Sequence, residues 1–115
     1  MSTLLERRCA NCAPGAPALS PVEQERFGRE IPEWQNLEGA RIRREFKFKT
    51  YLDGIEWARE AGQIVDAEDH HPDLRILYRK VIVELWTHTV KGLSENDYIV
   101  AAKLDRLFEA FPGKR

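Results

Sequence analysis

The residues A-R-I-R-R-E-F-K-F-K, positions 40–49, decide the fold, because apolar and charged side chains alternate along them. Successive side chains of a strand point to opposite faces, so this alternation predicts a strand with one buried face and one wet face. Arg44 interrupts the apolar row, which otherwise consists of Ala40, Ile42, Phe46 and Phe48. Residues 34–37 read as a shorter strand, and Glu38-Gly39 supplies a turn between the two. The segment therefore predicts a β-hairpin.

Helical periodicity replaces this alternation on both sides of the hairpin. Ser20-Pro21-Val22-Glu23 predicts a helix start with a capping serine, and Ile31-Pro32 predicts its end. From Thr50 to Glu68 or Asp69, apolar residues recur at steps of three and four, which predicts a longer helix. The stripe expected to face the sheet comprises Leu52, Ile55, Ala58, Gly62 and Val65.

The segment 74–87 is typical of a strand, but its apolar residues change phase. Val81, Val83 and Leu85 share one face, whereas upstream the same parity carries arginines. A bulge or tight turn near 78–80 would resolve this conflict. Ile82 and Trp86 fall on the opposite face, where a monomer would expose them, so we expect a subunit interface or a ligand wall there.

A third helix is predicted after Gly92, with Ser94 as its cap and Asp97 in the reciprocal position. Its apolar face comprises Val100, Leu104, Leu107, Phe108 and Phe111. The whole order is α-β-β-α-β-β-α. We therefore predict an α+β fold, an antiparallel sheet of three to four strands with three helices packed on one face.

Length and charge restrict the class of protein. With 115 residues the chain is one domain, which we place at 20–115, behind a flexible N-terminal leader at 1–19. A net charge of −1 argues against a nucleic-acid partner. No apolar run approaches the ~18 residues of a membrane span, and no signal-peptide core is present, so we expect a cytoplasmic protein.

Cys9 and Cys12 form a C-x-x-C in the predicted leader. A redox or zinc site would need a βαβ context or a second ligand pair, and neither follows in the sequence. We expect a tail without essential chemistry, although an inter-subunit disulfide or a shared metal stays open.

All three histidines lie within a short span: His70, His71 and His88. Imidazole, with an unperturbed pKa of ~6.5, can both give and take a proton near neutrality. Pro72 favours extended backbone at His71, so the adjacent rings should diverge and meet one ligand only at a cleft mouth. Structural histidines remain an alternative, and so does a zinc site, which diverging rings disfavour. No serine or cysteine has the context of a nucleophile.

These positions resemble the signature of the pterin-4a-carbinolamine dehydratases. The matching residues are Asp66, His70-His71-Pro72, Tyr78, His88 and Asp97, with Thr87 and Gly92-Leu93-Ser94-Glu95 also similar. The similarity covers about residues 20–111.

The resemblance implies a hydro-lyase that removes water from 4a-hydroxytetrahydropterin, gives quinonoid dihydropterin and thereby supports tetrahydropterin recycling. It implies His70, His71 and His88 around the pterin, with no metal and no cofactor. In the reaction, we expect His70 and His88 to exchange protons while His71 positions the substrate. The further residues expected in the site are Asp69, Trp86, Thr87 and Thr89 as substrate-binding, and Asp66, Tyr78 and Asp97 as supporting residues.

The resemblance also implies partners. Family members assemble as homo-dimers or homo-tetramers and serve aromatic amino-acid hydroxylases. Some relatives act as dimerisation partners or regulators of other proteins, so a non-catalytic binding module is the alternative function.

Overall fold

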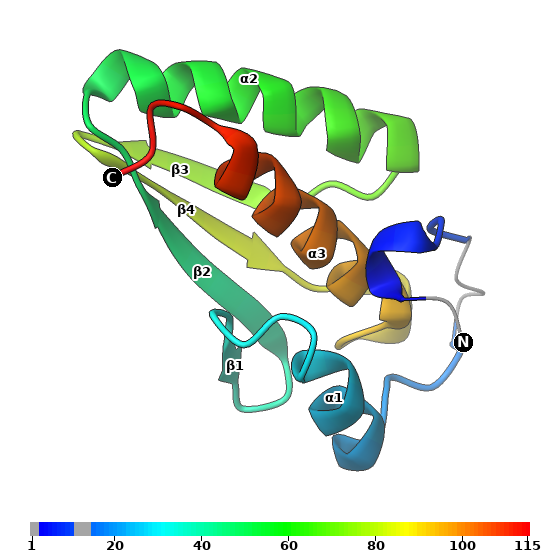
Figure 1. Ribbon diagram of the computed structural model, residues 1–115. Coiled ribbons are helices and arrows are strands. Elements are labelled where there is room, and N and C mark those ends of the chain that lie inside the picture. Colours follow the sequence, from blue (N-terminus) through cyan, green and yellow to red (C-terminus); the bar gives the residue numbers. More distant parts are fainter. Residues whose placement is uncertain (1–2, 11–14) are drawn as a thin grey trace.

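The computed structural model describes residues 3–10 and 15–115, and its α+β fold agrees with the predicted order of elements (Figure 1). The helices and strands are α1 (Pro21–Gly28), β1 (Gln35–Leu37), β2 (Arg41–Lys47), α2 (Tyr51–Glu68), β3 (Asp73–Leu77), β4 (Lys80–Leu85) and α3 (Glu95–Ala110). Two short 3₁₀ helices, η1 (Leu4–Glu6) and η2 (His88–Val90), complete the described elements. The four strands form an antiparallel sheet in the order β1-β2-β4-β3.

The predicted hairpin is formed by β1 and β2. The alternation along β2 determines which of its side chains face the core. Ile42 and Phe46 are buried, and they lie opposite Leu85 and Val81 of β4. Arg44 shares this face because α3 offers it a carboxylate: its Nη1 lies 2.6 Å from Asp105 Oδ1. The break in the apolar row is therefore an ion pair at the edge of the core.

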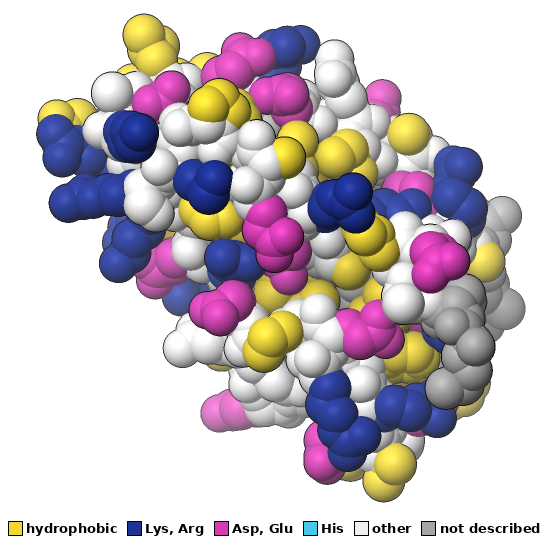
Figure 2. All heavy atoms as spheres, viewed as in Figure 1, with side chains coloured by type: hydrophobic (Ala, Val, Ile, Leu, Met, Phe, Trp, Pro, Cys, Tyr) yellow, Lys and Arg dark blue, Asp and Glu magenta, His cyan; other side chains and the backbone are white. Residues whose placement is uncertain are grey.

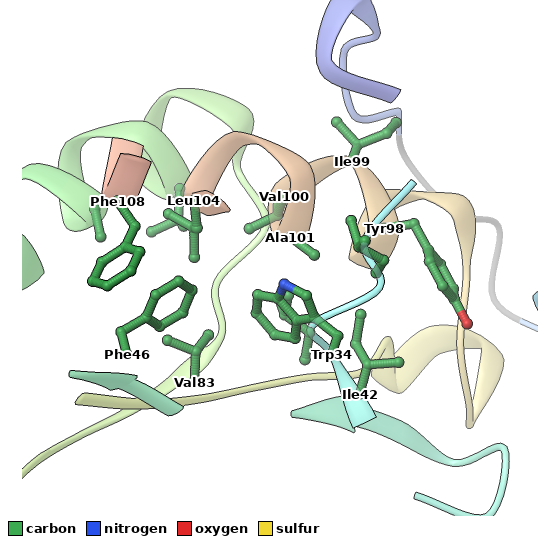
Figure 3. Packing of buried hydrophobic residues seen from close by; sticks show 14 of the residues in the cluster. Trp34, Ile42, Phe46, Val83, Tyr98, Ile99, Val100, Ala101, Leu104 and Phe108 are labelled. Carbon is green, nitrogen blue, oxygen red and sulfur yellow. The ribbon is translucent and has the colours of Figure 1, made fainter. Parts of the chain in front are cut away.

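Helices α2 and α3 lie across one face of the sheet, and α1 packs beside α3 (Figure 1). Aromatic rings fill the space between the layers. The ring centroid of Phe46 lies 4.5 Å from that of Trp57 in α2 and 5.1 Å from that of Phe108 in α3. Figure 3 shows Phe46 and Phe108 facing each other between sheet and helix. The core is continuous from the hairpin to α3, with Leu104 completely buried in it.

The stripe predicted for α2 is wrong in its first half. Leu52 is 72% exposed and Ile55 is 36% exposed, whereas Trp57 and Ala61 are completely buried. An indole removes more apolar surface from water than a leucine side chain does, so burial of Trp57 determines which side of the helix faces the sheet. Ala58 and Val65 are buried as predicted.

The phase change in the second pair of strands is a tight turn, as predicted: β3 ends at Leu77 and β4 begins at Lys80. The expectation of an exposed Ile82 is wrong, because this side chain is only 4% exposed in the single chain. On the central strand β4, Ile82 lies between Glu45 of β2 and Arg75 of β3. The aliphatic stems of such long side chains cover apolar neighbours, so no partner is needed to bury it.

Part of the predicted flexible leader packs against the domain. Leu4 is completely buried, and its backbone N–H donates to Glu30 Oε1 at 2.9 Å. The backbone N–H of Cys9 donates to Glu68 Oε1 at 2.8 Å. Cys12, the second cysteine of the C-x-x-C, lies outside the described residues.

The described helices are all too short or too polar to cross a bilayer. On the face seen in Figure 2, basic and acidic side chains are interspersed, in keeping with the net charge of −1.

Candidate active site

The start of α3 holds a completely buried carboxylate, that of Asp97. Ser94 caps the helix, and its backbone N–H donates to Asp97 Oδ2 at 2.9 Å, which completes the predicted capping box. The hydroxyl of Thr87 donates to the same oxygen at 2.9 Å. Donors of this kind offset the cost of burying a carboxylate. They also fix its orientation, with Oδ1 left for a partner outside the helix.

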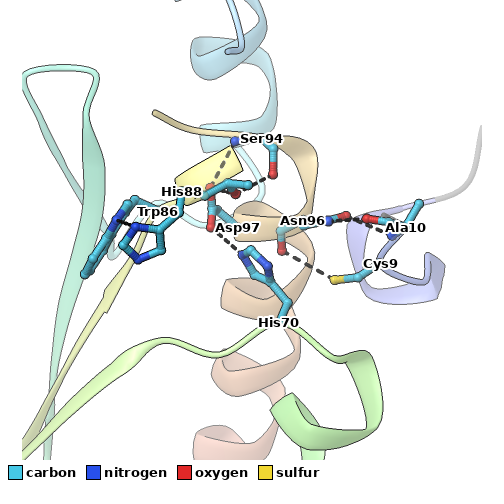
Figure 4. Close-up of polar contacts among 9 residues, drawn as sticks. Cys9, Ala10, His70, Trp86, His88, Ser94, Asn96 and Asp97 are labelled. Atoms are coloured by element: carbon cyan, nitrogen blue, oxygen red, sulfur yellow. Dashed lines mark hydrogen bonds and ion pairs between the residues drawn. The ribbon is translucent and has the colours of Figure 1, made fainter. Parts of the chain in front are cut away.

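That partner is His70, whose Nε2 lies 2.6 Å from Asp97 Oδ1 (Figure 4). Helix α2 ends at Glu68, its C-cap residue Asp69 has a left-handed conformation (φ 53°), and the next residue turns toward α3. The His70 side chain is only 12% exposed. An ionised carboxylate can only accept hydrogen bonds. In this contact the Nε2 atom of His70 is therefore the donor and carries a proton, and Nδ1 is left to contact a ligand.

His71 takes the opposite direction, as extended backbone requires. Its Nε2 lies 3.0 Å from Asp66 Oδ1, and its side chain is 54% exposed. The two carboxylates therefore orient adjacent imidazoles independently, Asp97 from α3 and Asp66 from α2.

His88 comes from the far side of the site, where the chain leaves β4 and enters η2. Trp86 Nε1 donates to His88 Nδ1 at 3.4 Å, and the two rings are steeply inclined, at 62°. The guanidinium carbon of Arg41 lies 4.6 Å from the indole centroid on the outer face of the sheet. These contacts place Trp86 between a fixed cation and the imidazole.

One cavity of about 410 Å³ joins these groups. It is lined by Ala10, Asp69, His70, His71, Trp86, Thr87, His88, Thr89 and Asn96. All three imidazoles and all four predicted substrate-binding residues thus line the same space, and Asp66 and Asp97 adjoin it through the histidines that they contact.

Tyr78 lies elsewhere. It occupies the turn between β3 and β4 and is 70% exposed. The six residues of β4 separate it from the cavity, which amounts to roughly 20 Å of strand. We therefore assign Tyr78 no contact with the site.

Two residues of the cavity wall were missed from the sequence, Asn96 and Ala10. The Asn96 amide donates to the Ala10 carbonyl at 2.6 Å and accepts from the Ala10 N–H at 3.1 Å (Figure 4). Ala10 is remote in the sequence and has no reactive group, so only an asparagine beside the helix cap could have given a signal.

Cys9 lies beside this wall, with Sγ 3.7 Å from the Asn96 carbonyl oxygen. Burial, together with the nearby Glu68 carboxylate, raises the pKa of the Cys9 thiol to about 12. The reactive, metal-binding form of cysteine is the thiolate, and the raised pKa disfavours this form at Cys9. Within residues 3–10 and 15–115, no three His, Cys, Asp or Glu side chains are grouped to hold a metal ion.

The chain is similar in sequence to one family of enzymes. The family model described as "Pterin 4 alpha carbinolamine dehydratase" matches residues 17–107. A protein of Nitrosospira multiformis is 42% identical over 106 residues, covering 92% of this chain and 93% of its own. One from Rubrobacter xylanophilus is 34% identical over 107 residues, covering 93% of this chain and 100% of its own. Both are provisionally named pterin-4-alpha-carbinolamine dehydratases.

A solved structure supports the same relation. The crystal structure of a Brucella melitensis protein, described as a transcriptional coactivator/pterin dehydratase, superimposes with a TM-score of 0.74 at 31% identity. The match covers 78% of this chain and 97% of the Brucella chain. Sequence and fold agree, and the chain belongs to the pterin-4a-carbinolamine dehydratase family.

Proposed function

We propose that this protein dehydrates 4a-hydroxytetrahydropterin to quinonoid dihydropterin by histidine acid–base catalysis, as a hydro-lyase in tetrahydropterin recycling. The observation that carries the proposal is the pair formed by His70 and buried Asp97, with a contact of 2.6 Å, at the wall of a cavity that two further imidazoles share. The family match supports the choice of a pterin as substrate.

The chemistry calls for groups of this kind. The bond between C4a and the hydroxyl oxygen breaks, the oxygen takes up a proton and leaves as water, and the neighbouring nitrogen N5 loses its proton. Acid–base assistance from a positioned side chain contributes ~10²–10⁴-fold to such a step. No electrons are gained or lost, so the reaction requires neither a redox cofactor nor another co-reactant.

Asp97 suits His70 to this work. A carboxylate that accepts a hydrogen bond from Nε2–H orients the ring. It also stabilises the imidazolium that forms when Nδ1 is protonated. Such an imidazolium delivers a proton from Nδ1, and the neutral ring accepts one at the same atom. His71, Trp86, Thr87 and Thr89 line the remaining cavity and are proposed to hold the pterin.

A spectrophotometric assay on enzymatically generated carbinolamine tests the proposal. The wild-type protein should accelerate loss of the carbinolamine well above the spontaneous rate, with saturation by substrate. A rate equal to the spontaneous one, with the protein folded, would refute the activity.

A second function of another class is a binding module that regulates a partner protein. It is favoured by the description of the Brucella relative as a coactivator. Saturable binding of a reduced pterin that His70→Ala weakens supports the enzyme, whereas a pure partner module should have no such affinity. A homo-dimer or homo-tetramer, service to an aromatic amino-acid hydroxylase and a cytoplasmic location remain predictions.

A further inference from the structure

The N-terminal segment, residues 3–10, supplies one wall of the cavity that the three imidazoles line. Ala10, at the end of the segment, lines this cavity beside Asn96 of α3. Figure 4 shows both residues on the side of His70 away from His88. A ligand that extends from His88 past His70 therefore meets the segment at the far end of the cavity.

Asn96 fastens the end of the segment to α3. Its side-chain amide donates to the Ala10 carbonyl at 2.6 Å, and its Oδ1 accepts from the Ala10 N–H at 3.1 Å. Asn96 is buried, whereas Ala10 is exposed at the cavity. Both polar groups of the Ala10 backbone thus have a partner, so this wall offers a ligand apolar contact and exclusion of water.

The rest of the segment is held at points that do not line the cavity. Leu4 is completely buried, and its N–H donates to Glu30 Oε1 at 2.9 Å. The Cys9 N–H donates to Glu68 Oε1 at 2.8 Å, immediately before the wall. These contacts bring Ala10 to the cavity from outside it.

The chain reaches the cavity wall a second time at Gly15, whose N–H donates to the carbonyl of Thr89 at 3.2 Å. Thr89 lines the cavity as well. Two contacts from the N-terminal part of the chain, Ala10 with Asn96 and Gly15 with Thr89, therefore end on residues of the same cavity.

We propose that the N-terminal segment is part of the substrate site and that Asn96 is the positioning residue that holds it there. The match to the family model begins at residue 17, so the family assignment does not supply this wall. The inference rests on the pterin substrate proposed above. Binding free energies are reciprocal: if the docked segment strengthens binding of the ligand, the ligand strengthens docking of the segment by the same factor.

Trypsin cleavage after Arg7 or Arg8 measures release of the segment, because a docked chain resists proteolysis. Without ligand, Asn96→Ala should be cleaved about 3–10-fold faster than wild type, since it lacks both hydrogen bonds to Ala10. An unchanged rate overturns the positioning role of Asn96.

The effect of a ligand on cleavage tests the reciprocal coupling. The probe is 7,8-dihydrobiopterin, a reduced pterin that has no 4a-hydroxyl group to lose. At saturation, judged by isothermal titration calorimetry, it should slow cleavage of the wild-type segment about 3–10-fold. Binding of the probe without this protection overturns the proposal. A wild type that binds no pterin counts against the proposed substrate, and cleavage of Asn96→Ala without ligand still decides whether Asn96 holds the segment.

Dehydration kinetics separate this wall from the acid–base groups. In Asn96→Ala, KM should rise about 3–10-fold while kcat stays within about threefold, because the pair of His70 and Asp97 is unchanged. Leu4→Ala loosens the other end of the segment and should also raise KM. Because Leu4 does not line the cavity, a rise there comes from the segment and not from a lost contact of Asn96 with the substrate.

Asn36→Ala is the matched control. The Asn36 amide likewise donates and accepts, to Gln24 Oε1 at 2.9 Å and from the Gly39 N–H at 2.7 Å, but it lies in the hairpin and does not line the cavity. KM and the cleavage rate should equal those of wild type in this variant. An unchanged KM in folded Asn96→Ala and Leu4→Ala proteins that trypsin cleaves faster overturns the proposal.

Discussion

Helix α3 carries two carboxylates at the sheet side of the molecule, Asp97 in its first turn and Asp105 two turns later. Asp97 is completely buried and accepts hydrogen bonds from Ser94, Thr87 and His70. The Asp105 side chain is 14% exposed and accepts from Trp34 Nε1 at 2.8 Å and from Arg44. The two groups share a helix and a chemistry, but their partners differ.

The partner determines what each carboxylate can do. The guanidinium of Arg44 lies over the rings of Phe46 and Phe108. Because arginine is permanently protonated, the cation beside Asp105 keeps its charge at all pH values of interest. Imidazole is a side chain that can both give and take a proton, and the ring of His70 lines a cavity. We therefore expect Asp105, beside a fixed cation, to affect the stability of the fold, and Asp97, beside an imidazole at a cavity, to affect the proposed catalysis.

The largest expected effect is a loss of dehydratase activity on substitution of His70, the partner of Asp97. His70→Ala removes the proposed proton carrier, so kcat/KM for carbinolamine dehydration should fall by ~10²–10⁴-fold. The free energy of unfolding, measured by urea denaturation, should change far less than the activity does. Near-wild-type turnover in a folded His70→Ala protein would contradict the role of His70.

The free energy of unfolding should change most when the surroundings of the other carboxylate, Asp105, are altered. Burial raises the pKa of Asp105 and outweighs the hydrogen bonds from Trp34 and Arg44, which act in the opposite direction, so these contacts offset only part of the cost of burying the carboxylate. Arg44→Met leaves this carboxylate without its cation and should lower the free energy of unfolding by about 2–4 kcal/mol.

The double variant Arg44→Met/Asp105→Asn is the control, because the asparagine carbonyl still accepts from Trp34. We expect it to recover at least half of the loss in a denaturation experiment. No recovery would mean that packing of the arginine stem, and not its charge, stabilises this region.

A third carboxylate, Glu68 of α2, gives the smallest effect. Burial opposes its ionisation, but hydrogen bonds from the Cys9 backbone N–H and from Lys103 outweigh burial and lower the pKa of Glu68 to about 2. A lowered pKa stabilises the fold above the ordinary value of 4.5, and this contribution is lost as the pH falls toward 2.

Glu68→Gln should therefore cost about 1–2 kcal/mol at pH 7, and its difference from wild type should shrink between pH 5 and pH 3. Denaturation at a series of pH values measures this. A difference that is independent of pH would show that the N-terminal segment is held by contacts other than the charge of Glu68.

The strands and helix ends could be predicted because their signals are local. Alternation along β2, the serine caps of α1 and α3 and the turn between β3 and β4 all appear within a few residues. The buried face of α2 could not be predicted in full, because Trp57 selects it through rings on β2 and α3. The same limit applies to Ile82, which neighbouring strands cover.

The residue types that line the candidate site could be predicted from the sequence, but the contacts between them could not. The sequence and the family resemblance together predicted the three histidines, which line one cavity, and Asp66 and Asp97, which contact two of them. The contact of His70 with Asp97 spans 27 positions, however, and no periodicity reports so distant a contact. The wall at Ala10 was missed for the same reason, since Asn96 holds it across 86 positions.

The most direct measurement compares kcat/KM for carbinolamine dehydration in Asp97→Asn and Asp105→Asn under conditions where both are folded. The account predicts a loss of about 10–100-fold in Asp97→Asn, because His70 loses its anionic partner, and a value within about twofold of wild type in Asp105→Asn. Equal losses in the two variants, or full activity in both, would contradict the assignment of Asp97 to catalysis.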